Sequence, residues 1–178
     1  MKNTLILLVA LFMATVNITA QDSTIKNFAK ADKGFIKQLN TVLENYYPLK
    51  DALVKTSATT AATAATDLAN TLEKAVTDKL TDEQKTYYTG HYNHLTTQLQ
   101  IIAGSSDVEV QRKAFEQVSL SMYALIKSFK ANAQTVYRQY CPMAFKGQGA
   151  YWLSDNEEVM NPYFGNKMLH CGSVEEEL

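Results

Sequence analysis

Four stretches of the chain repeat their apolar residues at spacings of three and four, and this pattern constrains the fold more than any other feature. Such spacing places the apolar side chains on one face of a helix. Four amphipathic helices joined by short connections bury their faces together in an up-and-down antiparallel four-helix bundle. The four stripes are Phe35, Leu39, Val42, Tyr46, Leu49 and Leu53; Ala58, Ala61, Ala65, Leu68, Leu72 and Val76; Tyr88, Tyr92, Leu95, Leu99 and Ile102; and Phe115, Val118, Met122, Leu125 and Phe129.

Local signals predict where these helices begin and end. Pro48 lies inside the first stripe, and because the periodicity continues past it we expect a kink within one helix; a break there is the alternative. Ser57 is a suitable N-cap for the second helix. Residues 81–84 form a capping box for the third helix, which Gly104 ends, and residues 106–109 have the same pattern before the fourth.

The helical period is lost after about residue 132, where glycines, prolines, aromatic residues and the only tryptophan become frequent. We expect a turn-rich module with short strands at 137–141 and 150–153, sealed by its aromatic side chains onto one end of the bundle. The acidic run 175–177 is interpreted as a solvated tail. The predicted fold class is mainly α, a four-helix bundle with a small, partly β C-terminal module, in one domain over 21–178 (bundle about 25–134, module about 135–178).

The N-terminus has the pattern of a secretory signal peptide over residues 1–20. Lys2 precedes an apolar run from Leu5 to Val16, and small residues lead to a cleavage site after Ala20. The run is shorter than the roughly 20 residues that span a membrane. We therefore expect a periplasmic or secreted protein, soluble after cleavage, that neither inserts into the membrane nor carries a lipid.

Charge and motif content exclude several functions. The chain has 17 basic and 18 acidic residues, so it lacks the positive surface that binds nucleic acid. It also lacks phosphate-binding, metalloprotease, serine-hydrolase and thioredoxin motifs, and we do not expect an enzyme.

Both cysteines and two of the methionines lie at the two ends of the C-terminal segment. Cys141 and Met143 are at its start; Met168, His170 and Cys171 are at its finish. Folding the segment back on itself would gather four sulfur atoms and an imidazole, and thiolate and thioether ligands select Cu(I) over hard cations. We predict a soft-metal site at these five residues, in which His170 faces away from the sulfurs if the stretch is a strand.

A structural disulfide is the alternative interpretation of Cys141 and Cys171. An even number of cysteines in an exported protein commonly forms disulfides, and this bridge would stabilise the fold by about 3–4 kcal/mol. Both interpretations require the two sulfurs to be neighbours in space. His91 and His94 are also spaced to share a metal on the third helix, but we interpret them as exposed or core-edge residues.

Several motifs resemble the bacterial domain-of-unknown-function family DUF3347. They are YCPMA at 140–144, GAYWLS at 149–154, NPYFG at 161–165 and MLxCG at 168–172, with QRxxF at 111–115 and LS at 120–121. The resemblance implies an exported helical domain that also occurs fused to the adaptor subunits of heavy-metal efflux pumps, and hence copper, silver or a similar ion.

The segment from Cys141 to Met143 is also similar to the start of the short heavy-metal-binding domains of copper pumps, although the soft ligands around Cys171 are in reversed order. Position 170 varies in the DUF3347 family, so the resemblance carries over the two cysteines, Met143 and Met168 rather than His170.

Our leading hypothesis is an exported, non-enzymatic protein that sequesters Cu(I) or hands it on to efflux. The alternative is a disulfide-stapled interaction module, without metal, that docks on an efflux adaptor or another envelope protein. A thiol oxidoreductase comes third.

Overall fold

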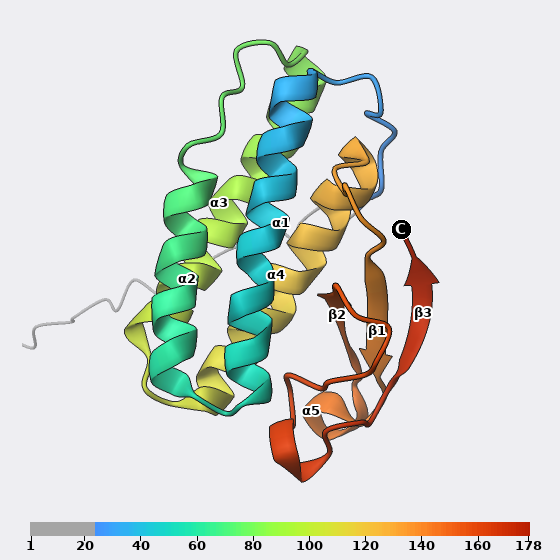
Figure 1. Ribbon diagram of the computed structural model, residues 1–178. Helices are drawn as coiled ribbons and strands as arrows, with labels where there is room; N and C mark the ends of the chain where they lie inside the picture. Colours follow the sequence, from blue (N-terminus) through green and yellow to red (C-terminus); the bar gives the residue numbers. More distant parts are fainter. Residues whose placement is uncertain (1–23) are drawn as a thin grey trace, which may run out of the picture.

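Four long helices form an up-and-down bundle, as the periodicity predicts (Figure 1). The computed structural model describes residues 24–178, and the predicted signal peptide lies outside the described residues. Consecutive helices pack against one another, and the first and fourth also pack together. The helices are α1 (Lys33–Val54), α2 (Ala58–Leu72), α3 (Asp82–Gly104) and α4 (Val108–Phe129).

Helix α1 runs without a break through Pro48, as predicted from the unbroken stripe. Its N-cap is Asp32, whose side chain accepts a hydrogen bond from the backbone N–H of Phe35 at 3.1 Å. The predicted cap Ser57 and the capping box of Thr81 and Gln84 are confirmed at the starts of α2 and α3.

Two predicted boundaries are wrong. Helix α2 ends at Leu72, so Val76 lies beyond the stripe and its side chain is 56% exposed. The N-cap of α4 is Asp107, not Ser106, and the predicted capping box does not form. The Asp107 carboxylate already accepts a hydrogen bond from the Glu109 N–H at 2.8 Å, which satisfies a free donor of the first turn.

A three-stranded antiparallel sheet follows the bundle, with strand order β2-β1-β3. The first two strands, β1 (Tyr137–Cys141) and β2 (Ala150–Ser154), are those expected from the sequence. The short α5 (Ala144–Gly147) connects them, and a 3-10 turn, η1 (Gly165–Lys167), precedes β3 (Ser173–Glu177).

Strand β3 corrects the prediction that residues 175–177 form a solvated tail. It pairs with β1 along its length, and Val136 and Leu178 exchange backbone hydrogen bonds beyond its end. Glu176 turns toward α4, where it forms an ion pair with Lys127 and accepts a hydrogen bond from the Tyr123 hydroxyl. Backbone pairing and these contacts outweigh the tendency of an acidic run to remain solvated.

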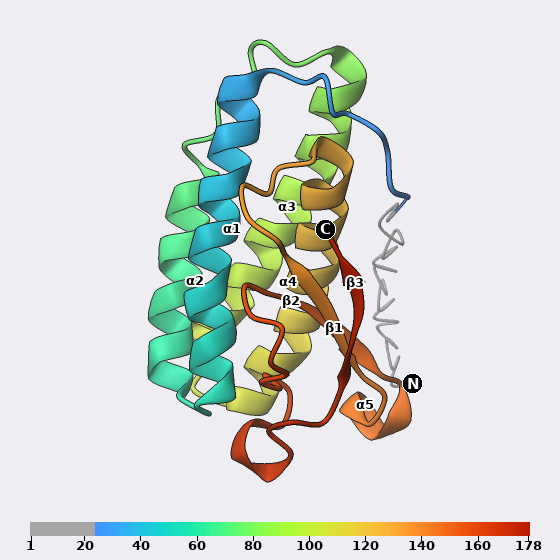
Figure 2. The ribbon, with the colours of Figure 1, turned by 45° about the vertical axis from the view of Figure 1, so that its right-hand side comes forward.

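The sheet lies along the side of the bundle rather than only on one end, which also corrects the prediction (Figure 2). Strand β2 packs on α4, with Trp152 and Leu153 buried. The buried hydroxyl of Tyr46 joins three elements: it accepts from the Leu153 N–H and is hydrogen-bonded to Ser119 of α4. The turn η1 extends past the end of the bundle where α1 finishes and α4 begins, and α5 lies at the same end.

No helix among residues 24–178 has the length and apolar character needed to cross a membrane.

Candidate functional site

The two cysteines meet at one end of the sheet. Cys141 is the last residue of β1, and Cys171 precedes β3 by two residues. The pairing of Tyr140 with Ser173 brings their chains together, and the two Sγ atoms lie 3.0 Å apart. Both are free thiols in this structure; Cys141 is buried and Cys171 is partly exposed. The predicted proximity of the two sulfurs is confirmed.

Gly172 allows the backbone after Cys171 to pass close to β1. Its φ of +144° lies in a region that favours glycine, and a Cβ atom here would be 2.6 Å from the Tyr140 carbonyl oxygen and 3.1 Å from the Trp152 ring. A larger residue would therefore push the Cys171 backbone away from Cys141.

Asn161 holds the loop that carries Cys171. Its side chain is fully buried, and its amide nitrogen donates to the Cys171 carbonyl at 2.7 Å. Its amide oxygen accepts from the N–H groups of Tyr163 and Phe164, and its own N–H donates to the Leu169 carbonyl. One side chain thus fixes both halves of the loop. The NPYFG motif contained this residue, but spacing alone gave no indication of its role.

Arg112 ties the same loop to the bundle. Its side chain is 2% exposed, and its guanidinium donates to the carbonyls of Pro162 and Leu53, to the Thr56 hydroxyl and to Glu109. The loop is therefore anchored to the C-terminal end of α1 and the start of α4. Sequence reasoning noted Arg112 within a motif but did not predict that it is buried.

Met143 and Met168, which lie two and three residues from the cysteines in the sequence, line one shared hollow on the surface. The hollow has a volume of about 610 Å³, and the two methionine side chains are 54% and 37% exposed. We call it the methionine hollow, and its walls include Met143, Phe145, Lys146, Phe164, Lys167 and Met168. Among the described residues that line it there is no cysteine. The structure thus brings the thiols into contact and places both thioethers on an adjoining surface.

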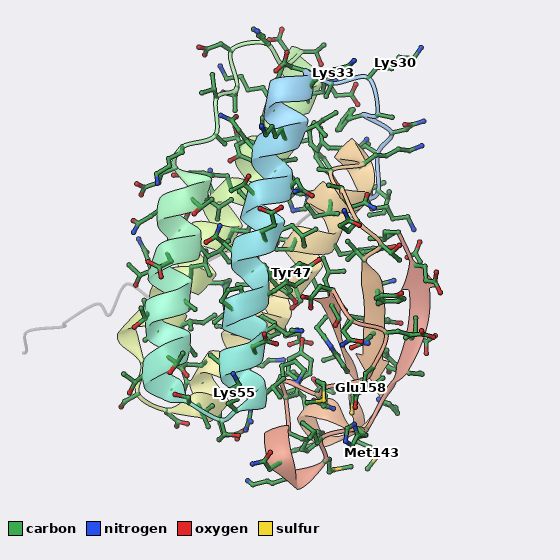
Figure 3. All side chains as sticks on the ribbon, in the orientation of Figure 1. Lys30, Lys33, Tyr47, Lys55, Met143 and Glu158 are labelled. Carbon is green, nitrogen blue, oxygen red and sulfur yellow. The ribbon has the colours of Figure 1, made fainter. Side chains whose placement is uncertain are left out.

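His170 is held at the edge of the site. Its imidazole is 63% exposed, and Nδ1 lies 3.0 Å from the Val159 carbonyl and 3.9 Å from a Glu158 carboxylate oxygen. Figure 3 shows Glu158 and Met143 at the same end of the molecule. Within residues 24–178, no three His, Cys, Asp or Glu side chains are grouped to hold a metal ion. A soft-metal site here would rest on the two thiols in contact, and participation of the Met143 and Met168 thioethers stays a prediction.

The contact between the thiols makes Cys171 harder to ionise. The hydrogen bond with Cys141, together with burial and the repulsion between two thiolates, raises the pKa of Cys171 above its ordinary value. A raised pKa disfavours the thiolate of Cys171 in the absence of a metal ion or an oxidant.

The two histidines of α3 each contact a different side chain. His91 is 2% exposed and its ring lies edge-on to Tyr87, with ring centres 4.6 Å apart. His94 is hydrogen-bonded to Gln117 of α4, and burial lowers its pKa. The half-buried His94 agrees with its interpretation as a residue at the edge of the core, whereas the interpretation of His91 as exposed or core-edge is wrong because its side chain is buried.

Fold and sequence together define a helical-bundle protein of a family whose function is unknown. The family described as "Protein of unknown function (DUF3347)" matches residues 42–134, just over half of the chain, and the protein belongs to this family. The match covers most of the bundle and ends before β1, so it does not include the cysteines. No curated protein and no solved structure matches the chain.

Proposed function

We propose that this protein is exported and binds a soft metal ion, with Cu(I) as the first candidate, in order to sequester it or hand it on. The thiolates of Cys141 and Cys171 are the primary ligands, and Met143 and Met168 are supporting thioether ligands. The observation that carries the proposal is the 3.0 Å contact between the two Sγ atoms. Two thiolates this close share a single cation readily and repel each other without one.

The surroundings of the thiols favour a preorganised site. Asn161 orients the Cys171 backbone, and Gly172 allows it to approach β1, so the two sulfurs are positioned before any ligand arrives. Such supporting contacts commonly change metal affinity by about 10–100-fold. The partly exposed Cys171 gives a metal ion access from solvent.

Competition with a Cu(I) chelator on reduced protein tests the proposal. We expect about one tightly bound Cu(I) per chain, little affinity for Mg²⁺ or Ca²⁺, and loss of binding in Cys141→Ser and Cys171→Ser. Affinity should also fall as the pH is lowered, because each thiol must lose its proton to bind. Absence of Cu(I) binding in the wild type, or affinity equal to that of the wild type in both serine variants, would overturn the proposal.

Methionine variants measure the contribution of the thioethers. Met143→Leu and Met168→Leu keep side-chain volume and apolarity, so each should cost less than about 1.5 kcal/mol of stability. Together they should weaken Cu(I) binding by about tenfold. Met122→Leu, in the buried core of α4, is the matched control and should leave copper binding unchanged. Unchanged affinity in the double variant would limit the site to the two cysteines.

The same sulfur contact also favours a second candidate, an interaction module stapled by a Cys141–Cys171 disulfide. In that case Cys141→Ser should lower the melting temperature of oxidised, metal-free protein, and neither methionine variant should affect copper. Mass spectrometry of the protein isolated from the cell envelope without reductant distinguishes two free thiols from a disulfide by the loss of two hydrogen atoms.

A further inference from the structure

Most of the exposed large apolar side chains lie at one end of the molecule. Among the described residues these are Ile101, Val110, Met143, Met168 and Val76, and only Val76 lies elsewhere, in the loop after α2. Ile101 and Val110 line a second hollow, of about 430 Å³, where α3 ends and α4 begins. Exposed apolar side chains gathered in this way mark binding surfaces more often than isolated ones do.

Lys113 joins the two hollows into one surface. It lines the second hollow, and its ammonium nitrogen lies 4.2 Å from the centre of the Phe145 ring, which lines the methionine hollow. The surface therefore continues from the end of the bundle across α5 to η1.

The backbone at this surface is strained. Phe145 and Lys146 are consecutive non-glycine residues in the left-handed region, with φ of 50° and 61°. Strain of this kind persists only where the surrounding structure maintains it, and it concentrates at binding sites. Here it holds an aromatic ring and a cation together on the wall of the methionine hollow.

The charge of the surface is positive. Lys146 and Lys167 are exposed and form no ion pair with any described residue. Of the described residues lining the hollow, Glu109 alone is acidic, and it is already paired with Arg112. Figure 3 places the exposed Lys55 and Glu158 at the same end of the molecule, and Lys30 and Lys33 at the opposite end; Glu158 does not line the hollow.

We propose that this surface docks a segment of a partner protein that carries acidic residues between apolar side chains. The lysines would pair with the carboxylates, and the two methionines and Phe145 would receive the apolar side chains. Flexible, polarisable methionine side chains suit such contacts because they adapt to different shapes. The surface is open rather than enclosed, as the exposure of both methionines shows, so a chain segment fits it better than a small molecule does. This proposal goes beyond metal binding and does not depend on it.

Nuclear magnetic resonance titration of the exported chain tests this proposal. The probe is a short synthetic peptide in which glutamates alternate with leucine and phenylalanine, and its control has lysine at every glutamate. We expect the acidic peptide to shift resonances of Met143, Phe145, Lys146, Lys167 and Met168, and the basic peptide to shift none. Equal binding of both peptides, no binding, or shifts confined to another face would overturn the proposal.

Charge reversal sharpens the test. Lys146→Glu combined with Lys167→Glu should weaken acidic-peptide binding about tenfold or more, because two attractions become repulsions. The matched control, Lys30→Glu with Lys33→Glu at the opposite end, should leave it unchanged. Equal loss in both double variants would overturn the proposal, as would preference for anionic lipid vesicles over the peptide or self-association of the chain through this surface.

Metal and peptide binding can be separated in the same protein. Cys141→Ser with Cys171→Ser should abolish copper binding and preserve peptide binding, because neither cysteine lines the methionine hollow. Lys146→Glu with Lys167→Glu should preserve copper binding while weakening peptide binding. Loss of peptide binding on removal of copper would contradict an independent docking surface and would leave the metal proposal intact.

Discussion

The bundle and the C-terminal segment are stabilised by different kinds of interaction. In the bundle, the long helices bury apolar stripes and local caps begin each helix. In the C-terminal segment, single polar side chains bridge distant backbone: buried Gln139 donates to the carbonyls of residues 156–158, and Asn161 and Arg112 bridge in the same way. The bundle depends on a repeated pattern, and the C-terminal segment depends on individual residues.

This difference predicts a one-way dependence. The sheet rests on α4, whereas α1, α2 and α3 bury most of their apolar side chains against one another and α4. The C-terminal segment should therefore unfold whenever the bundle does, while the bundle should survive local opening of that segment. Trp152, the only tryptophan, lies in β2 and reports on the sheet by fluorescence, and circular dichroism reports on the helices.

Leu68→Ala should have the largest effect. Leu68 is fully buried in α2, and its truncation leaves a cavity costing about 3–4 kcal/mol. Denaturant unfolding should shift equally by tryptophan fluorescence and circular dichroism, because loss of the bundle removes support from the sheet. If the circular dichroism transition shifts to lower denaturant while the fluorescence transition stays at its wild-type position, the sheet does not depend on the bundle as proposed. Exposed Thr66→Ala, in the same helix, is the control.

Asn161→Ala should have the second-largest effect on stability. It should also separate the unfolding transition seen by tryptophan fluorescence from the one seen by circular dichroism. It removes three hydrogen bonds and leaves buried backbone groups without partners, at a cost of about 2–3 kcal/mol. We expect the fluorescence transition to move to lower denaturant than the circular dichroism transition. If both shift together, the C-terminal segment and the bundle are one cooperative unit. The exposed Asn156→Ala serves as the comparison.

Gly172→Ala should have a smaller, local effect. The φ of Gly172 and the nearby Tyr140 carbonyl both disfavour a Cβ atom at this position. We expect the free energy of unfolding to fall by about 1–2 kcal/mol. Disulfide formation between Cys141 and Cys171 under mild oxidant should slow as well, as measured by thiol labelling. Gly90→Ala in α3 is the counterpart in the bundle: a Cβ there meets open space, so the change should stabilise by up to about 1 kcal/mol. Equal changes in the free energy of unfolding for Gly172→Ala and Gly90→Ala would contradict the proposed difference between the C-terminal segment and the bundle.

Glu176→Gln should have the smallest effect. Burial alone would raise the pKa of Glu176, but hydrogen bonds from Lys127 and Tyr123 outweigh it and lower the pKa. A lowered pKa means that the ionised group stabilises the fold at neutral pH, and this stabilisation is lost as the pH falls through the folded-state value. Because the Glu176–Lys127 pair is partly exposed, we expect Glu176→Gln to lower the free energy of unfolding by about 0.5–1 kcal/mol at neutral pH.

The difference between wild type and Glu176→Gln in urea denaturation should therefore vanish in acid. Exposed Glu177→Gln should show little difference at either pH. A gap that persists unchanged in acid would indicate lost packing rather than lost charge.

Most of the bundle could be predicted because its information is local. Spacing of three and four residues placed all four helices, and Ser57 and Thr81 indicated two of their starts. Strand β3 was missed because three successive glutamates resemble a solvated tail, and its partner β1 lies more than thirty residues earlier in the chain. No local sequence pattern predicts that Glu176 forms an ion pair with Lys127 of α4.

The candidate site was predictable only in part. The mirrored placement of Cys141 and Cys171 predicted their contact, which the structure confirms. Whether Met143 and Met168 also reach the thiols stays a prediction, since they line an adjoining hollow. The roles of Asn161 and Arg112 depend on backbone groups brought close by the fold, and such distances are not encoded in spacing along the chain.

The late position of β3 has a consequence for the order of events during synthesis. A ribosome releases the chain from its N-terminus, so the helices can assemble long before the strand that positions Cys171 exists. Cys141 therefore has no partner thiol until Cys171 and the residues of β3 emerge and pair with β1. Neither a metal ion shared by the two cysteines nor a disulfide between them can form before Cys171 has been added to the chain.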